Sequence, residues 1–269
     1  MRKKIDRSLA PWAMMLLCGL LLFCGELCAA SPVRVAVVQP AFEWGDVDRN
    51  IEMLAPKITA IEGCDLIILP ELFTSGCDMQ KKSKEQGAAS RQAVARRYQE
   101  SLEVMQQWAK STRAVVMGSV IYSEEGLFYN RLLAVRPSGE YHVYDKHNCF
   151  KHGSFTPGDK HLVVDIKGHR FATYICYDLR FSEWSANKGR YDTAIYIANW
   201  PTSRSEDWST LLKERAVENR ANVIGVNCVG RDTRAQIDFM GNSSVLSAAG
   251  DVVAQCATNK EQVIIVDLK

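Results

Sequence analysis

Short apolar and β-branched runs that end near a proline recur from residue 33 onward and constrain the fold of this chain most strongly. Such runs are typical of strands that are buried on both faces of a sheet. They occupy residues 33–40 (VRVAVVQP), 64–70 (CDLIILP) and 193–201 (TAIYIANWP). Amphipathic helices are predicted at residues 48–62, 84–110 and 206–222, where apolar side chains repeat at helical spacing. Buried strands with covering helices predict a single domain built as a layered α/β sandwich.

The middle of the chain is predicted to consist of successive strands without helices between them. These segments span residues 114–122, 127–137, 140–146 and 161–177, the last with a turn at Lys167-Gly168. Strands that follow one another through short turns indicate antiparallel hairpins. A helix is predicted at residues 179–190, and the last strands at residues 222–230, 243–251 and 262–268.

The bulk composition excludes some classes of function. The chain has 269 residues, of which 47% are hydrophobic, and this is ample for a globular core. Its formal net charge of +2 is too small to indicate a nucleic-acid-binding protein.

The first thirty residues have the pattern of an export signal. A basic start (MRKKIDR) precedes an apolar stretch (PWAMMLLCGLLLFCG) and then small residues in CAAS. We therefore predict a signal peptide over residues 1–30, an exported and periplasmic protein, and a functional domain over residues 31–269. An uncleaved membrane anchor is the alternative, although the apolar stretch is shorter than the roughly 20 residues of a spanning helix.

Six of the nine cysteines lie beyond this predicted signal. They are Cys64, Cys77, Cys149, Cys176, Cys228 and Cys256. Their wide spacing does not match a disulfide framework, although an exported protein could pair them. A free thiol at Cys176 would leave an odd number, and the disulfide state stays open.

Three reactive residues lie at or just beyond the ends of predicted strands: Glu71, Lys146 and Cys176. Strand ends are where α/β proteins collect chemistry from distant parts of the chain. A carboxylate, an ammonium and a thiol brought together would supply a general base, an oxyanion stabiliser and a nucleophile. We expect the lysine and a helix N-terminus to lower the pKa of the thiol. Taken singly, each residue also has an ordinary reading, as a buried cysteine or a solvated surface charge.

Other uses of the reactive side chains find less support. His147, Cys149 and His152 lie close together, but their spacing matches no standard zinc pattern, and we expect no metal. A cysteine–histidine protease is also disfavoured, because all five histidines precede Cys176.

The order of several motifs resembles the nitrilase superfamily of carbon–nitrogen hydrolases. ILPELFTSG, YDK and CYDLRF are followed by ANWP and RAVEN, as in the bacterial ω-amidase branch. The similarity covers nearly all of the chain from Val33 to Lys269. It implies a four-layer αββα sandwich that commonly forms homodimers through its helical face, and it implies no cofactor.

The resemblance also implies roles for matching residues. Glu71 would be the base, Lys146 would stabilise the oxyanion, and Cys176 would be acylated. The backbone N–H of Tyr177 would be the second oxyanion donor. The implied reaction is hydrolysis of a small ω-amide, such as 2-oxoglutaramate or succinamate, to a carboxylate and ammonia through a thioester.

Two further residues are candidates for substrate binding. Trp200, in ANWP, is expected near the pocket, and core packing is its alternative. Arg180, in DLRF, could bind a substrate carboxylate through its guanidinium, or pair internally with Asp178 or Glu218.

The segment after Lys146 departs from the family pattern. It reads HNCFKHGSFTPGD, which looks several residues shorter, and no glutamate occurs between Glu140 and Glu183. A second glutamate of the family therefore has no clear counterpart. Two alternatives follow: a catalytically impaired relative retained for binding or assembly, and an amidase or acyltransferase acting on an envelope component.

Overall fold

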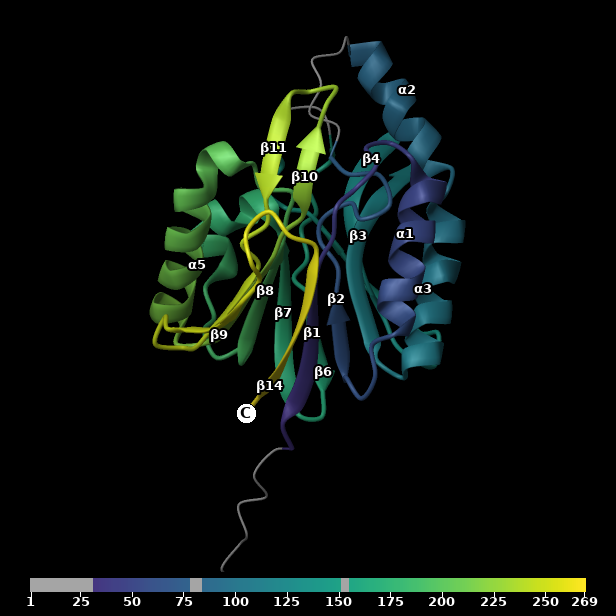
Figure 1. The fold of residues 1–269 in the computed structure, drawn as a ribbon. Coiled ribbons are helices and arrows are strands. Elements are labelled where there is room, and N and C mark those ends of the chain that lie inside the picture. The colour runs from purple at the N-terminus through teal and green to yellow at the C-terminus, as the bar shows by residue number, and fades with distance from the viewer. Residues whose placement is uncertain (1–30, 78–83, 151–154) are drawn as a thin grey trace, which may run out of the picture. The chain divides into compact units, whose positions relative to one another are not determined.

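Two six-stranded mixed sheets form the centre of the computed structural model, which describes residues 31–77, 84–150 and 155–269 (Figure 1). Residues 31–269 make up one compact unit. Among the described residues, no helix is both long and apolar enough to cross a membrane. The predicted signal peptide and His152 lie outside the described residues.

The first sheet has the strand order β14-β1-β2-β3-β4-β5. Its strands are β1 (Val33–Gln39), β2 (Leu66–Ile68), β3 (Val115–Glu124), β4 (Leu127–Val135), β5 (Tyr141–Asp145) and β14 (Gln262–Leu268). β1, β2 and β3 run parallel, whereas β3, β4 and β5 form the antiparallel succession that the sequence predicted. β14 pairs antiparallel with all seven residues of β1, from Val33↔Leu268 to Gln39↔Gln262.

The second sheet has the order β13-β12-β9-β8-β7-β6. Its strands are β6 (Val163–Ile166), β7 (His169–Ile175), β8 (Thr193–Ile197), β9 (Asn222–Val226), β12 (Ser244–Leu246) and β13 (Val252–Gln255). β7, β8 and β9 run parallel, and β6 pairs with β7 as the hairpin predicted around Lys167-Gly168. A separate two-stranded ribbon is formed by β10 (Val229–Asp232) and β11 (Ile237–Met240).

Helices cover the outer face of each sheet (Figure 1). They are α1 (Val47–Thr59), α2 (Lys84–Ala95), α3 (Tyr98–Thr112), α4 (Ser182–Ser185) and α5 (Ser205–Asn219), with the 3₁₀ turns η1 (Cys176–Arg180) and η2 (Thr202–Arg204). α1 and α3 pack on the first sheet and α5 packs on β9 of the second. The layers therefore follow the order αββα, and the predicted fold class is confirmed.

Alternation along β1 shows how the sequence builds these layers. Val35 and Val37 point into the core shared by the two sheets, whereas Ala36 and Val38 point toward α1 and α3. Successive strand residues face opposite sides of a sheet, so a strand with apolar partners on both sides must be apolar throughout. This explains the unbroken apolar runs in the sequence.

Two predicted helices differ from the structure. The helix predicted at 84–110 is divided into α2 and α3, because Arg97 leaves helical geometry (φ −93, ψ 9) while its guanidinium bonds both Asp48 and Glu100. The helix predicted at 179–190 is wrong except for the short α4. There Asn187 accepts a hydrogen bond from the backbone of Tyr191, and such side-chain bonds compete with a helix.

The strand predicted at 222–230 is also interrupted, at Asn227. Its side chain accepts from the backbone N–H of Trp200 and donates to the carbonyl oxygens of Trp200 and Gly241. This amide ends β9 and ties it to the segment that follows β8, beside the site described next.

Candidate active site

Glu71, Lys146 and Cys176 line one pocket at the ends of strands from both sheets. Glu71 lies shortly after β2, Lys146 follows β5 directly, and Cys176 follows β7 as the first residue of η1. The pocket has a cavity volume of about 40 Å³. Its lining consists of Glu71, Cys77, Lys146, Phe150, Cys176, Tyr177, Asn199, Trp200, Pro201 and Arg204. The structure therefore brings together the three residues that the sequence singled out.

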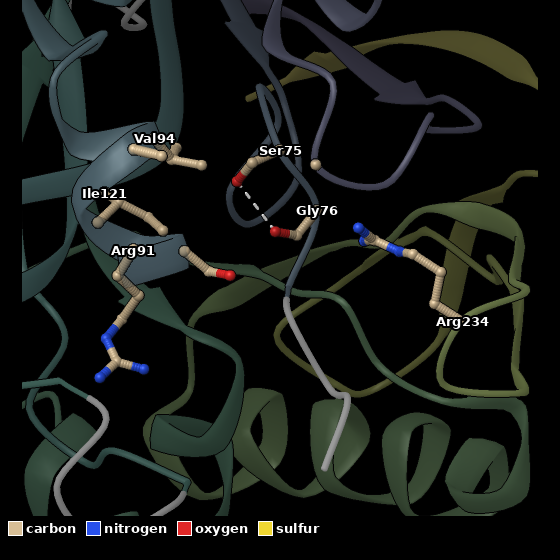
Figure 2. A pocket seen from close by; sticks show the side chains of 9 residues that line it. Ser75, Gly76, Arg91, Val94, Ile121 and Arg234 are labelled. Atoms are coloured by element: carbon tan, nitrogen blue, oxygen red, sulfur yellow. Dashed lines mark hydrogen bonds between the residues drawn. The ribbon is translucent and has the colours of Figure 1, made fainter. Parts of the chain in front are cut away.

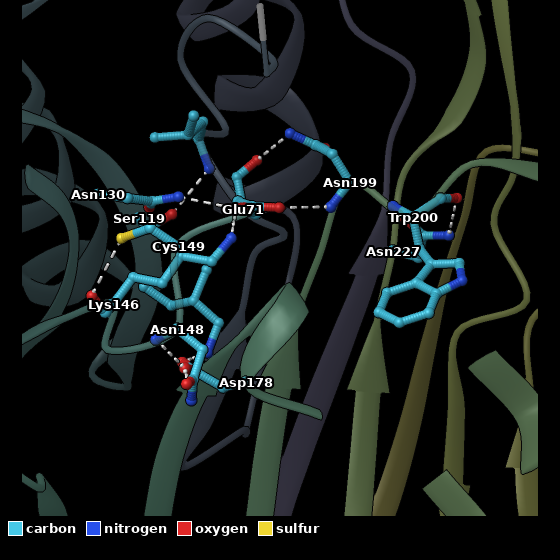
Figure 3. A network of polar contacts seen from close by, with 12 residues as sticks. Glu71, Ser119, Asn130, Lys146, Asn148, Cys149, Asp178, Asn199, Trp200 and Asn227 are labelled. Carbon is cyan, nitrogen blue, oxygen red and sulfur yellow. Dashed lines mark hydrogen bonds and ion pairs between the residues drawn. The ribbon is translucent and has the colours of Figure 1, made fainter. Parts of the chain in front are cut away.

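Glu71 is buried and holds three hydrogen bonds through its carboxylate (Figure 3). Its Oε1 accepts from Lys146 Nζ at 2.7 Å and from Asn130 Nδ2 at 2.7 Å, and its Oε2 accepts from the backbone N–H of Asn199 at 2.9 Å. Asn199 Nδ2 also donates to the backbone oxygen of Glu71 at 2.9 Å. Asn130 belongs to the first sheet, and Asn199 follows β8 of the second, so the carboxylate is fixed from both sheets.

Lys146 pairs with this carboxylate in a site that excludes water, since only 5% of its side chain is exposed. Burial by itself lowers the pKa of Lys146, but the negative charge of Glu71 raises it, as does Cys176 when it is ionised, and the pKa lies above the ordinary value. The ammonium is therefore charged at neutral pH. A charged donor held in a dry pocket can stabilise a developing oxyanion.

Cys176 sits at a sharp strand-to-helix turn and has a left-handed backbone, with φ of 48°. Such a conformation is uncommon for a residue with a side chain and costs of the order of 1 kcal/mol or more. Burial raises the pKa of the Cys176 thiol well above its usual value, Glu71 raises it further, and Lys146 lowers it. The expectation of a lowered thiol pKa is therefore wrong: the lysine is present, but burial and the nearby carboxylate outweigh it. A protonated thiol needs a base, and the carboxylate of Glu71 lines the same pocket.

Asp178, two residues after the thiol, is fully buried and anchors the turn (Figure 3). Its Oδ1 accepts from the backbone N–H of Asn148 at 2.7 Å, and its Oδ2 accepts from the backbone N–H of Ile175 at 3.0 Å and from Tyr144 Oη at 2.7 Å. Burial raises the pKa of Asp178, and these hydrogen bonds oppose that rise. The carboxylate therefore links the end of β5, the segment after Lys146 and the cysteine turn.

Tyr177 and Trp200 both line the pocket. Tyr177 is the second residue of η1, where backbone N–H groups have no partner inside the helix, and its ring lies edge-on to Phe150. Trp200 is only 3% exposed and packs on Trp208, while its Nε1 donates to the carbonyl oxygen of Arg204 at 2.7 Å. Trp200 thus forms part of the core and part of the pocket wall at once.

Arg180 is not among the residues that line the pocket. Its guanidinium pairs with Asp207 and lies 5.1 Å from the centre of the Trp200 ring. Arg180 thus pairs internally, but with neither of the two acids considered from the sequence. Glu218 pairs with Arg215, and Asp178 accepts the hydrogen bonds described above. The arginine that does line the pocket is Arg204, which sequence reasoning missed.

Two further residues that hold Glu71, and that the sequence did not single out, are amides. Asn130 and Asn199 carry no charge and match no reactive pattern, so their roles depend on a contact between two sheets that periodicity does not reveal. The available signal for Asn199 was its place directly before Trp200 in ANWP.

The segment after Lys146 has no metal-binding geometry in its described part. His147 stacks on Trp184 with ring centres 3.6 Å apart, and Cys149 Sγ lies 3.7 Å from the carbonyl oxygen of Lys146. Across the described residues, no group of three or more His, Cys, Asp or Glu side chains could hold a metal ion. All six described cysteines are free thiols.

A larger cavity, of about 190 Å³, lies apart from these residues (Figure 2). Ser75, Gly76, Arg91, Val94, Ile121 and Arg234 are among the residues around it. Its lining contains neither a carboxylate nor a thiol, whereas the smaller pocket is lined by both.

Residues 34–269 match the family model for the carbon-nitrogen hydrolases. The chain belongs to the carbon–nitrogen hydrolase family. This confirms the superfamily that the motifs resembled and the enzyme class that they predicted. This carbon–nitrogen hydrolase is 36% identical over 226 residues to omega-amidase YafV of Escherichia coli K12, covering 82% of this chain and 84% of the relative.

Further similarities agree with this family. The chain is 28% identical over 204 residues to 2-oxoglutaramate amidase of Bacillus subtilis, covering 71% of this chain and 73% of that one. Among solved structures, XC1258 from Xanthomonas campestris superposes with a TM-score of 0.81 and 30% identity, covering 88% of this chain and 91% of that chain. That protein is a CN-hydrolase superfamily member with an arsenic adduct in its active site.

Proposed function

We propose that this carbon–nitrogen hydrolase is a thiol-dependent amidase that converts a small ω-amide of a dicarboxylic or 2-oxo acid to a carboxylate and ammonia. One observation carries the proposal: the buried Glu71–Lys146 pair, with Nζ 2.7 Å from Oε1, lies in the same pocket as Cys176. A base, a charged donor and a nucleophile are the groups that acyl transfer from an amide requires.

The first half of the reaction forms a thioester. Glu71 takes the thiol proton as the sulfur of Cys176 bonds to the amide carbon, and the carbonyl electron pair moves to oxygen. Lys146 Nζ and the backbone N–H of Tyr177 hold that oxyanion. Glu71 then gives its proton to the nitrogen, the C–N bond breaks, and ammonia leaves.

The second half regenerates the enzyme. Glu71 takes a proton from a water molecule, whose oxygen bonds to the thioester carbon, and the same two donors hold the new oxyanion. The C–S bond then breaks, the sulfur recovers its proton from Glu71, and the product leaves as a carboxylic acid that gives its remaining proton to ammonia or to solvent. Acylation and deacylation thus use one base, which suits a carboxylate anchored on three donors.

A second buried carboxylate, that of Asp178, also favours the charged form of Lys146. This supports an active enzyme although the family's second glutamate is missing. Two carboxylates thus favour the protonated lysine, although only Glu71 bonds its Nζ among the described residues. The relatives named as omega-amidase and 2-oxoglutaramate amidase support the substrate class.

Ammonia release by the chain from Ser31 onward tests the proposal. The substrates are 2-oxoglutaramate, succinamate, glutaramate, glutamine, asparagine and simple nitriles, and the matched variant is Cys176→Ala. We expect release from the ω-amides that disappears in the variant. A folded wild-type protein that releases ammonia from none of them would overturn the proposal and favour an impaired site or a substrate in the cell envelope.

Export and self-association are further proposals about the same enzyme. The export signal over residues 1–30 predicts that the mature protein begins at Ser31 in the periplasm. Cell fractionation with sequencing of the mature N-terminus tests this, and a cytoplasmic protein that retains residues 1–30 would refute it. Homodimer formation is tested by sedimentation of the purified protein, where a monomer at micromolar concentration would contradict it.

A further inference from the structure

The charged side chains that line the pocket carry one more positive charge than negative charge. Glu71 and Lys146 neutralise each other at the buried end, where their side chains are 2% and 5% exposed. Arg204 adds a positive charge on an exposed side chain of the same pocket lining. Among the described residues, its guanidinium has no carboxylate partner.

Neighbouring arginines are paired, which makes Arg204 distinctive. Arg180 lies over the Trp200 ring and pairs with Asp207, and Arg215 pairs with Glu218 along α5. The guanidinium of Arg204 instead lies 5.0 Å from the centre of the Phe150 ring, another residue of the pocket lining. A cation that rests on an aromatic face keeps its N–H donors available to an anion.

The backbone of Arg204 is fixed as well. Its N–H donates to the carbonyl oxygen of Pro201 at 3.0 Å, and its own carbonyl oxygen accepts from Trp200 Nε1 at 2.7 Å. Pro201 and Trp200 also line the pocket. The arginine is therefore carried by the same short segment that forms the wall, and this limits the positions its side chain can reach.

We propose that Arg204 binds the free carboxylate of the substrate and thereby selects amides that carry a negative charge at the end remote from the amide. The planar guanidinium matches a carboxylate with two parallel hydrogen bonds. A substrate then spans the pocket with its amide carbon at Cys176, its chain along Trp200 and Phe150, and its anionic end at Arg204. This inference rests on the proposed amidase function but concerns a different residue and a different property, namely charge selection.

Ligand binding without turnover tests the inference independently of catalysis. Calorimetric titration of Cys176→Ala with glutaramate is compared with titration of Cys176→Ala/Arg204→Gln, and pentanamide serves as the neutral amide of the same chain length. We expect the second substitution to weaken glutaramate binding about tenfold, in line with the loss of an exposed charge-assisted contact. Arg204→Lys should retain part of the affinity. Arg49→Gln, at an arginine of α1 that pairs with Glu52 and does not line the pocket, should retain all of it.

Steady-state kinetics then separates the two proposals. In the wild-type background, Arg204→Gln should raise KM for glutaramate by a much larger factor than KM for pentanamide. Equal effects on the two amides, or unchanged affinity for glutaramate, would overturn the role of Arg204. Glutaramate binding that depends on Arg204 without any ammonia release from wild-type protein would instead refute the amidase while supporting charge selection.

Discussion

Glu71, the proposed base, shows at the scale of a single residue how a carboxylate can be held rigidly and still have room to accept a proton. Three donors occupy its carboxylate: Lys146, Asn130 and the backbone of Asn199. A carboxylate offers about four acceptor positions, so one remains for the thiol of Cys176. That thiol is protonated at rest, since burial raises its pKa and the charge of Glu71 raises it further.

Glu71→Gln is therefore expected to produce opposite effects on thiolate formation and on catalysis. The variant loses the negative charge that raises the pKa of Cys176 and keeps the positive charge of Lys146 that lowers it. We expect the pH profile of Cys176 alkylation by iodoacetamide to shift to lower pH, while ammonia release falls by at least about a hundredfold, as for loss of a general base. Cys176→Ser gives the background from other thiols. An unmoved or upward-shifted profile would contradict this assignment of charges.

Lys146 provides a prediction about stability. Removing one partner of a buried ion pair costs about 3–5 kcal/mol, whereas removing both partners costs less than the sum. We expect Lys146→Met and Glu71→Gln each to lower the free energy of unfolding in urea, and the double variant to recover part of the loss. Additive losses would show that the two charges do not stabilise each other.

The pair also predicts a dependence on pH. The pKa of Lys146 is raised in the folded state. Its contribution to the stability of the fold is therefore complete below the pKa of an unfolded lysine, about 10.4, and declines as the pH rises beyond that value. The difference in unfolding free energy between wild type and Lys146→Met should be constant from pH 7 to 9 and shrink at higher pH. A difference that grows with alkaline pH would have the wrong sign.

At the scale of elements, the close approach of Gly158 to the end of β5 sets the position of the lysine. Its backbone N–H donates to the carbonyl oxygen of Lys146 at 3.0 Å. A Cβ atom at Gly158 would lie 2.3 Å from the carbonyl oxygen of Asp145. Backbone cannot yield as a flexible side chain can, so glycine is needed here for space.

Gly158→Ala should therefore displace the end of β5 and the lysine with it. We expect a loss of about 1–3 kcal/mol in the free energy of unfolding, typical of overpacking, together with reduced ammonia release. Gly87→Ala is the control. That glycine lies in α2, where an added Cβ would meet only the flexible end of Arg91, and alanine favours a helix. Wild-type activity in Gly158→Ala would show that β5 tolerates the shift.

The same elements show how far sequence reasoning extends. Local patterns predicted the strand ends at Glu71, Lys146 and Cys176, because apolar runs and their terminations are encoded by neighbouring residues. They did not reveal Asn130 or Arg204, because Asn130 reaches Glu71, and Arg204 reaches the pocket, only when segments distant in sequence pack together. The helix predicted at 179–190 was wrong for a related reason: side chains such as Asn187 take up backbone groups that a helix would use.

At the scale of the whole molecule, the site belongs to both sheets and to the core between them. Glu71 comes from the first sheet, Cys176 from the second, and the inner faces of the two sheets share one apolar cluster. A shared core favours a single cooperative transition on unfolding. The active site should then persist until that transition and vanish with it.

Urea denaturation of the chain from Ser31 onward can test this. We expect ammonia release, far-UV circular dichroism and tryptophan fluorescence to change together. Trp108 packs beside the first sheet and Trp208 beside the second. Replacing either by Phe therefore lowers the share of the fluorescence that reports on its own sheet. Midpoints that separate between the two variants, by more than their separate effects on stability, would show that the sheets unfold independently.

The pairing of β14 with β1 affects how the chain folds while it is being synthesised. β1 is among the first described segments to be synthesised, yet one of its edges is covered only by residues 262–268. Until those residues leave the ribosome, the nascent chain carries an open, valine-rich edge that can pair with other chains. The first sheet therefore cannot be completed until translation is almost finished. The exposed edge of β1 needs protection by chaperones for nearly all of that time.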